Sequence, residues 1–125
     1  MRAILALSVL AFASSAQAGF YTGNDLQKFC QQSPDGIAGY IAGFIDKQTY
    51  DSDVFNTHIK RTPQDAAAYV AALRIGSNIC YPGPIILQQP RDIVCRYLNN
   101  HPENRQWSAE ETVRTALMEA WPCKK

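Results

Sequence analysis

Four cysteines constrain the fold of this chain more than any other feature of its sequence. They are Cys30, Cys80, Cys95 and Cys123. In a chain that reaches an oxidising compartment, an even number of cysteines predicts two disulfides, and the spacing leaves three connectivities open. A zinc site is the competing interpretation. It is disfavoured because no C-x-x-C pair occurs and neither His58 nor His101 has a regular ligand spacing to a cysteine.

Residues 1–18 have the composition of a secretory signal peptide. Arg2 precedes the apolar stretch from Ile4 to Phe12, and small residues lead up to Ala18. We therefore expect cleavage after Ala18, with residues 19–125 forming a single domain in the bacterial periplasm or outside the cell. The apolar stretch is about half of the ~20 residues that a membrane span requires, and no later stretch is longer. Membrane insertion of the mature chain is not expected.

The charge balance narrows the classes of partner. The chain has 12 basic and 11 acidic residues, which are scattered along it. A nearly neutral chain of this kind lacks the basic surface that binds nucleic acid or an anionic membrane. The partner is therefore expected to be recognised by shape and local contacts.

Thr22 and Asp25 have the three-residue spacing of a capping box, which predicts a first helix over residues 23–32. The cluster Ser33-Pro34-Asp35-Gly36 predicts a turn that ends this helix. A second helix is predicted from Gly36 to Asp46, where apolar residues recur at helical spacing.

Gly39 and Gly43 lie inside this second predicted helix. Glycine lowers helix stability, so we expect both residues to lie where another backbone comes close. A phosphate-binding loop is disfavoured because no lysine or strand accompanies the glycines. We expect no cofactor.

From Lys47 to Arg61 the helical periodicity fails, and aromatic residues mix with polar ones. This pattern predicts a long exposed loop or a frayed helix end. Thr62, Pro63 and Asp65 then predict the start of a further helix, which runs to Gly76.

Two more helices are predicted in the C-terminal part. One follows Pro90 and ends before Pro102, and the other opens at Ser108, which has capping-box spacing with Glu111. No useful length of sequence has the two-residue period of a strand. The predicted fold class is all-α, a compact array of about five helices braced by two disulfides. The side chains expected to be mostly buried are Phe44, Tyr97, Leu117 and Trp121.

A series of short blocks follows in order along the chain. The blocks are Gly39-Tyr40-Ile41-x-Gly43 with Asp46, then Cys80-Tyr81-Pro82, Cys95-Arg96-Tyr97-Leu98, His101-Pro102-Glu103 and the closing Trp121-Pro122-Cys123. Together with the N-terminal segment, this arrangement resembles the Rap/Tai family of periplasmic immunity proteins. Members of that family protect Gram-negative bacteria against peptidoglycan-cleaving amidase effectors of type VI secretion, by binding the effector and occluding its active site. The resemblance implies that this chain binds and inhibits such an amidase and is not an enzyme.

The resemblance also implies how the cysteines pair. Cys80 and Cys123 match the recurrent cysteines of the family, which implies one disulfide between them. The second disulfide then joins Cys30 to Cys95. In this interpretation Cys95 stands in for the family cysteine that Ala38 replaces.

The stretch from Tyr50 to His58 is the predicted partner-binding segment. It combines aromatic side chains with a lack of burial periodicity, and interface energy concentrates in such aromatic anchors. Tyr50 and Phe55 are the expected anchors, and Asp51 and Asp53 the expected polar contacts. The alternative, in which Phe55 folds back onto the core, stays open.

Two other classes of function are a hydrolase and a general binding protein. A hydrolase is disfavoured because His58 and His101 are the only histidines and no serine lies in a nucleophile elbow. Glu110 and Glu111 are adjacent on one helix turn and cannot flank a substrate. The other alternative is a general periplasmic binding or stress protein of the same fold without an amidase target. The sequence leaves the target, the binding surface and the choice between a monomer and a homodimer open.

Overall fold

A computed structural model describes residues 19–61 and 79–124, except for the side chains at positions 55, 56 and 58–61. This part contains four α-helices, α1 (Gly23–Gln32), α2 (Pro34–Arg61), α4 (Gln88–Asn100) and α5 (Ala109–Ala120), and one 3-10 turn, η1 (Pro102–Asn104). Its only β pairing is two isolated bridges. The described chain is all-α as predicted, with four helices where about five were expected. The predicted signal segment and the predicted helix from Thr62 to Gly76 lie outside the described residues.

The start of α1 is fixed by the predicted capping box. The carboxylate of Asp25 accepts a hydrogen bond from the Thr22 amide at 2.9 Å, and the Thr22 hydroxyl accepts one from the Asp25 amide at 3.4 Å. These bonds satisfy backbone donors that the first turn of a helix leaves open. The predicted range of residues 23–32 is confirmed.

A single residue, Ser33, separates α1 from α2, so the predicted four-residue turn is wrong. The Ser33 amide donates to the Phe29 carbonyl at 2.9 Å and closes α1. The Ser33 hydroxyl accepts from the Gly36 amide at 3.3 Å and caps α2. Pro34 and Asp35 occupy the first turn of α2, where the fixed φ of proline and a carboxylate are both favoured.

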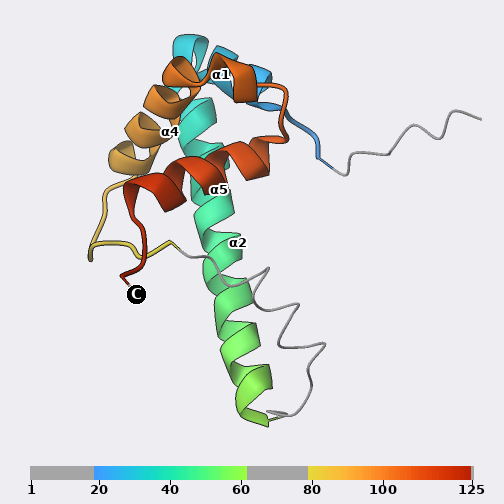
Figure 1. The fold of residues 1–125 in the computed structure, drawn as a ribbon, viewed down its shortest axis with the longest axis vertical. Coiled ribbons are helices and arrows are strands. Elements are labelled where there is room, and N and C mark those ends of the chain that lie inside the picture. Colours follow the sequence, from blue (N-terminus) through green and yellow to red (C-terminus); the bar gives the residue numbers. More distant parts are fainter. Residues whose placement is uncertain (1–18, 62–78, 125) are drawn as a thin grey trace, which may run out of the picture.

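The second half of α2, residues 47–61, is here named the arm. It is helical to Arg61, so of the two predicted alternatives the long loop is wrong and the chain continues as the end of a helix. Lys47 pairs with Asp51 one turn away, and the Thr57 hydroxyl donates to the Asp53 carbonyl at 2.9 Å. The arm extends past the other described helices (Figure 1), which explains why its sequence lacks an apolar stripe. None of the described helices, α2 included, is both long and apolar enough to cross a membrane.

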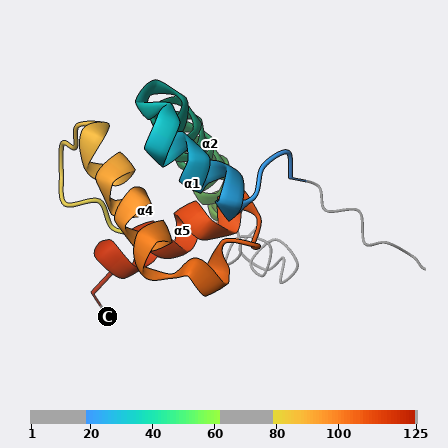
Figure 2. The same ribbon diagram turned by 90° about the horizontal axis from the view of Figure 1, so that it is seen from above.

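The core lies where α1, α4 and α5 pack around the first half of α2 (Figure 2). The fully buried aliphatic side chains are Leu26, Ile37, Ile41, Val94, Leu98, Val113 and Leu117. Of the side chains predicted to be buried, Tyr97 and Leu117 are in this core. Phe44 and Trp121 are partly buried and pack against it. The same core holds the start of α5 against α2.

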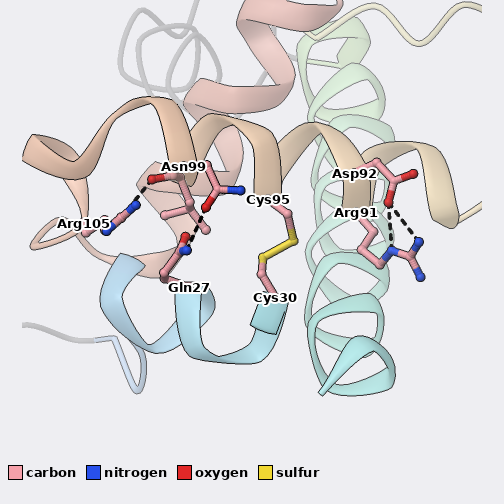
Figure 3. The surroundings of a disulfide bond; sticks show 8 residues. Gln27, Cys30, Arg91, Asp92, Cys95, Asn99 and Arg105 are labelled. Carbon is pink, nitrogen blue, oxygen red and sulfur yellow. Dashed lines mark hydrogen bonds and ion pairs between the residues drawn. A yellow bond between two sulfur atoms is a disulfide. The ribbon is translucent and has the colours of Figure 1, made fainter. Parts of the chain in front are cut away.

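The disulfides join Cys30 to Cys95 and Cys80 to Cys123, which is the pairing that the family resemblance implies. The first connects α1 to α4 (Figure 3). The second lies beside a backbone hydrogen bond of 2.9 Å from the Cys80 amide to the Trp121 carbonyl. The C-terminal tail is therefore fixed to the segment that precedes α4.

Candidate partner-binding surface

The arm carries two large apolar side chains that remain exposed. Tyr50 is 65% exposed and Val54 is 50% exposed. They are four residues apart on one helix, so they lie one turn apart on the same side. Exposed aromatic and aliphatic side chains on a rigid element suit the anchor role in a protein interface. Tyr50 was predicted as an anchor, whereas Val54 was missed although its spacing from Tyr50 is visible in the sequence.

The two predicted polar contacts, Asp51 and Asp53, do not lie on one side of the arm. Asp51 and Asp53 are two positions apart and point to nearly opposite sides of α2. Asp51 pairs with Lys47, whereas Asp53 is exposed. Phe55 and His58 belong to the helical backbone of the arm, and their side chains lie outside the described part of the structure.

A cavity of about 620 Å³ lies between α2 and α5 and is here named the α2/α5 groove. On α2 it is lined by Gly39, Tyr40, Gly43, Phe44, Lys47, Gln48 and Asp51, and on α5 by Glu110, Glu111 and Arg114. Of the predicted binding residues whose side chains are described, which are Tyr50, Asp51 and Asp53, only Asp51 lines the groove. The groove therefore begins on the body of the molecule and continues onto the arm.

Gly39 and Gly43 form part of the groove wall. A Cβ atom added at either position would have no heavy atom within 4 Å among the described residues. No backbone within residues 19–61 and 79–124 therefore comes close to either glycine, contrary to the expectation for this part of the chain. The two glycines lie one turn apart on the exposed side of α2 and leave its backbone bare toward the groove.

Aromatic rings gather at one end of the groove. Tyr21 packs edge-on against Tyr40 with ring centroids 5.9 Å apart, and against Phe29 at 5.4 Å. Burial raises the pKa of Tyr40, and the negative charge of Glu110 raises it further. The Tyr40 phenol therefore stays protonated at neutral pH, close to a carboxylate.

Only some of the charged side chains along the groove form ion pairs with described residues. Lys47 pairs with Asp51, and Arg114 lies 3.8 Å from Glu111. Glu110 makes no ion pair with any described residue. Among the described side chains, the groove therefore carries one uncompensated negative charge next to its aromatic end.

His101, one of the two histidines weighed for catalysis, lies beside a smaller cavity of about 220 Å³ between α4 and α5. Its Nδ1 is 3.1 Å from the Glu103 carboxylate, and its ring packs on Tyr97 at 4.5 Å. A backbone hydrogen bond at Glu103, and then the His101 ring, lower the pKa of that carboxyl. Neither contact supplies a nucleophile, and the His101 amide closes α4 by donating to the Tyr97 carbonyl. Within residues 19–61 and 79–124, no group of three His, Cys, Asp or Glu side chains is placed to hold a metal ion.

A family model of the Rap1a immunity proteins matches residues 22–123. The chain belongs to the Rap1a immunity protein family. The match begins at Thr22, which caps α1, and ends at Cys123, which closes the second disulfide. The resemblance inferred from the short sequence blocks is thus confirmed. A Rap1a immunity protein has a protein effector as its partner, which it neutralises by binding. No curated protein and no solved structure matches the chain.

Proposed function

We propose that this Rap1a immunity protein inhibits a peptidoglycan amidase effector of type VI secretion in the periplasm. It acts by binding and carries out no catalysis of its own. Family membership supports the general role, and the arm supports the choice of surface. The single observation that carries this choice is the 65% exposure of Tyr50 on a helix that extends past the rest of the body.

The arm suits insertion into an enzyme cleft. It spans 15 of the 28 residues of α2, so at 1.5 Å per residue it is about 22 Å long. A helix that is already formed loses less conformational entropy on binding than a loop that must become ordered. We assign Tyr50, Asp51, Asp53, Phe55 and His58 to this contact, with Val54 beside Tyr50.

Export to the periplasm is part of the proposal. All four cysteines are paired, which fits an oxidising compartment. Residues 1–18 would then direct export and be removed after Ala18. Intact-mass measurement of the protein from a periplasmic fraction tests this, with a chain that starts at Gly19 and retains both disulfides as the expected result. A full-length chain in the cytosolic fraction would contradict it.

The decisive experiment measures inhibition directly. Amidases encoded near this gene are purified, and their hydrolysis of peptidoglycan is followed as the immunity protein is added up to an equal molar ratio. Wild type should abolish the activity of its cognate amidase. Tyr50→Ala should raise Kd about 10-fold or more. The matched control is Ile86→Ala, because Ile86 is also 65% exposed but lies in the segment before α4.

Each contrary result has a distinct meaning. If no amidase from the same genome is slowed, the proposed target is wrong. Retention of many unfolded proteins without a tight single partner would favour the general binding or stress protein instead. A Tyr50→Ala variant with a lower Tm and unchanged affinity would show that the arm is structural and that the binding surface lies elsewhere.

A further inference from the structure

The α2/α5 groove has the length of a short polypeptide segment. Its α2 lining runs from Gly39 to Asp51, which at 1.5 Å per residue is about 18 Å. An extended chain covers this distance with about five or six residues. A side chain from a partner can approach closely at Gly39 and Gly43, because nothing described lies within 4 Å of the Cβ positions there.

The groove combines an apolar wall with a negative charge that favours a cation. Tyr40 and Phe44 are partly buried and offer ring surface beside the bare glycine backbone. The two ion pairs on the rim leave Glu110 as the one acid of the described groove lining that makes no ion pair with a described residue. A cation placed there gains an ion pair with the exposed carboxylate of Glu110, next to the partly buried Tyr40 ring. An anion would be repelled.

We infer that the α2/α5 groove is a second contact site for the effector. It accepts a projecting segment of the effector in which an apolar side chain lies over Gly39 and Gly43 and a neighbouring lysine or arginine pairs with Glu110. The inference rests on the proposed function for the identity of the partner. It places the effector on two adjacent surfaces, since the groove continues onto the arm through Lys47 and Asp51.

The test uses the amidase that wild type inhibits in the hydrolysis assay, with Kd measured by calorimetry and Tm measured on the free variants. Gly43→Trp fills the groove from within. It should raise Kd about 10-fold or more while Tm stays at or above that of wild type, because a helical glycine is removed and no existing contact is lost. A purely structural position would instead lose stability.

Charge variants test the cation independently of shape. Glu110→Lys should raise Kd about 10-fold or more, and Glu110→Gln should raise it less. The matched control is Glu119→Lys, because Glu119 is an exposed acid of the same helix that lies beside the smaller cavity. This control should stay within about twofold of the wild-type Kd.

The outcomes distinguish a failure of the groove as a second contact site from a failure of the proposed function. If wild type inhibits the amidase and both Gly43→Trp and Glu110→Lys bind like wild type, the inference is wrong and the proposed function stands. If wild type binds no amidase, the inference and the proposed function are both wrong. If Gly43→Trp turns a dimer into a monomer in sedimentation and leaves amidase affinity unchanged, the occupant is a second copy of this chain and the inference is overturned.

Discussion

The phenol of Tyr81 donates a hydrogen bond to Oε1 of Gln48 at 2.9 Å, across 33 positions of sequence. This bond joins the middle of α2 to the segment that leads into α4. Burial raises the pKa of Tyr81, so the phenol remains a donor at neutral pH. The Tyr81 ring also packs edge-on against Trp121 at 5.5 Å. The base of the arm and the C-terminal tail are therefore connected through one side chain.

Tyr81→Phe should weaken this connection without removing the ring. We expect the free energy of unfolding to fall by about 0.5–1.5 kcal/mol, the usual net value of one hydrogen bond. Urea denaturation followed by circular dichroism measures it. In Tyr81→Phe/Gln48→Ala the two losses should be less than additive, and full additivity would show that the bond contributes nothing.

Two glycines should respond in opposite ways to the same substitution. A Cβ on Gly23 would lie 2.8 Å from the Arg105 carbonyl oxygen, so Gly23→Ala should cost about 1–3 kcal/mol through overpacking. Gly43→Ala has free space and should gain about 0.5–1 kcal/mol from the helix preference of alanine. Thermal melts of both variants check the difference. Similar shifts of Tm in one direction would contradict the packing at Gly23.

The buried amide of Gln27 makes Asn99 important for stability. Gln27 is 8% exposed, and its Nε2 donates to the Asn99 side-chain oxygen at 2.8 Å (Figure 3). The Gln27 Oε1 has no partner among the described residues. Asn99→Ala should therefore cost about 1–3 kcal/mol by leaving a buried donor unpaired as well. Gln27→Leu should be nearly neutral, and a large loss in that variant would show that the amide has another partner.

Acid should destabilise the chain through Asp25. A hydrogen bond from the Thr22 amide, and then one from its hydroxyl, lower the pKa of Asp25 below the usual 3.8. A carboxyl with a lower pKa in the folded state contributes stability above its ordinary pKa and loses it as the pH falls through the folded-state value. We expect Tm to decrease below about pH 4, and less steeply in Asp25→Asn. An equal slope in wild type and variant would assign the acid sensitivity to other carboxyls.

Both disulfides should raise the free energy of unfolding. The disulfide that closes the longer loop should raise it slightly more. Cys30 and Cys95 are 65 positions apart, and Cys80 and Cys123 are 43 apart. Loop-closure entropy gives each about 2–4 kcal/mol. Replacing both cysteines of one pair by alanine and measuring urea denaturation tests the order. Non-reducing peptide mapping checks the pairing, and a peptide that links Cys30 to Cys80 would contradict it.

Local signals made parts of this fold predictable. The capping box at Thr22 and the cap at Ser108 are set by residues three positions apart, so their helices could be placed from sequence. The arm could not be, because an exposed helix has no apolar stripe and is held by pairs such as Lys47 with Asp51. The start of α2 directly after Ser33 could not be predicted either, because Ser-Pro-Asp-Gly is equally typical of a turn and of a helix start.

The α2/α5 groove could not be predicted, because it exists only after distant segments pack together. Its two sides come from residues 39–51 and residues 110–114. Glu110 and Glu111 are adjacent in sequence, which predicts a poor catalytic pair, and their place in the groove depends on α2 lying opposite. In the sequence, Gly39 and Gly43 indicate only a cost to helix stability. Whether such glycines receive a backbone or leave an opening is decided by tertiary contacts, which periodicity does not report.

The order of the paired cysteines along the chain has a consequence for biogenesis. Cys80 lies between Cys30 and Cys95 in the sequence, whereas its partner Cys123 lies after Cys95. The two disulfide-closed segments therefore overlap along the chain. A chain that emerges from its N-terminus exposes Cys30 and Cys80 first, and these two are not partners. If the chain is exported as proposed, oxidation that joins Cys30 to Cys80 would require thiol exchange to reach the native pairs, over seconds to hours depending on the isomerase. The yield of active protein should depend on a disulfide isomerase more than on the strength of the oxidant.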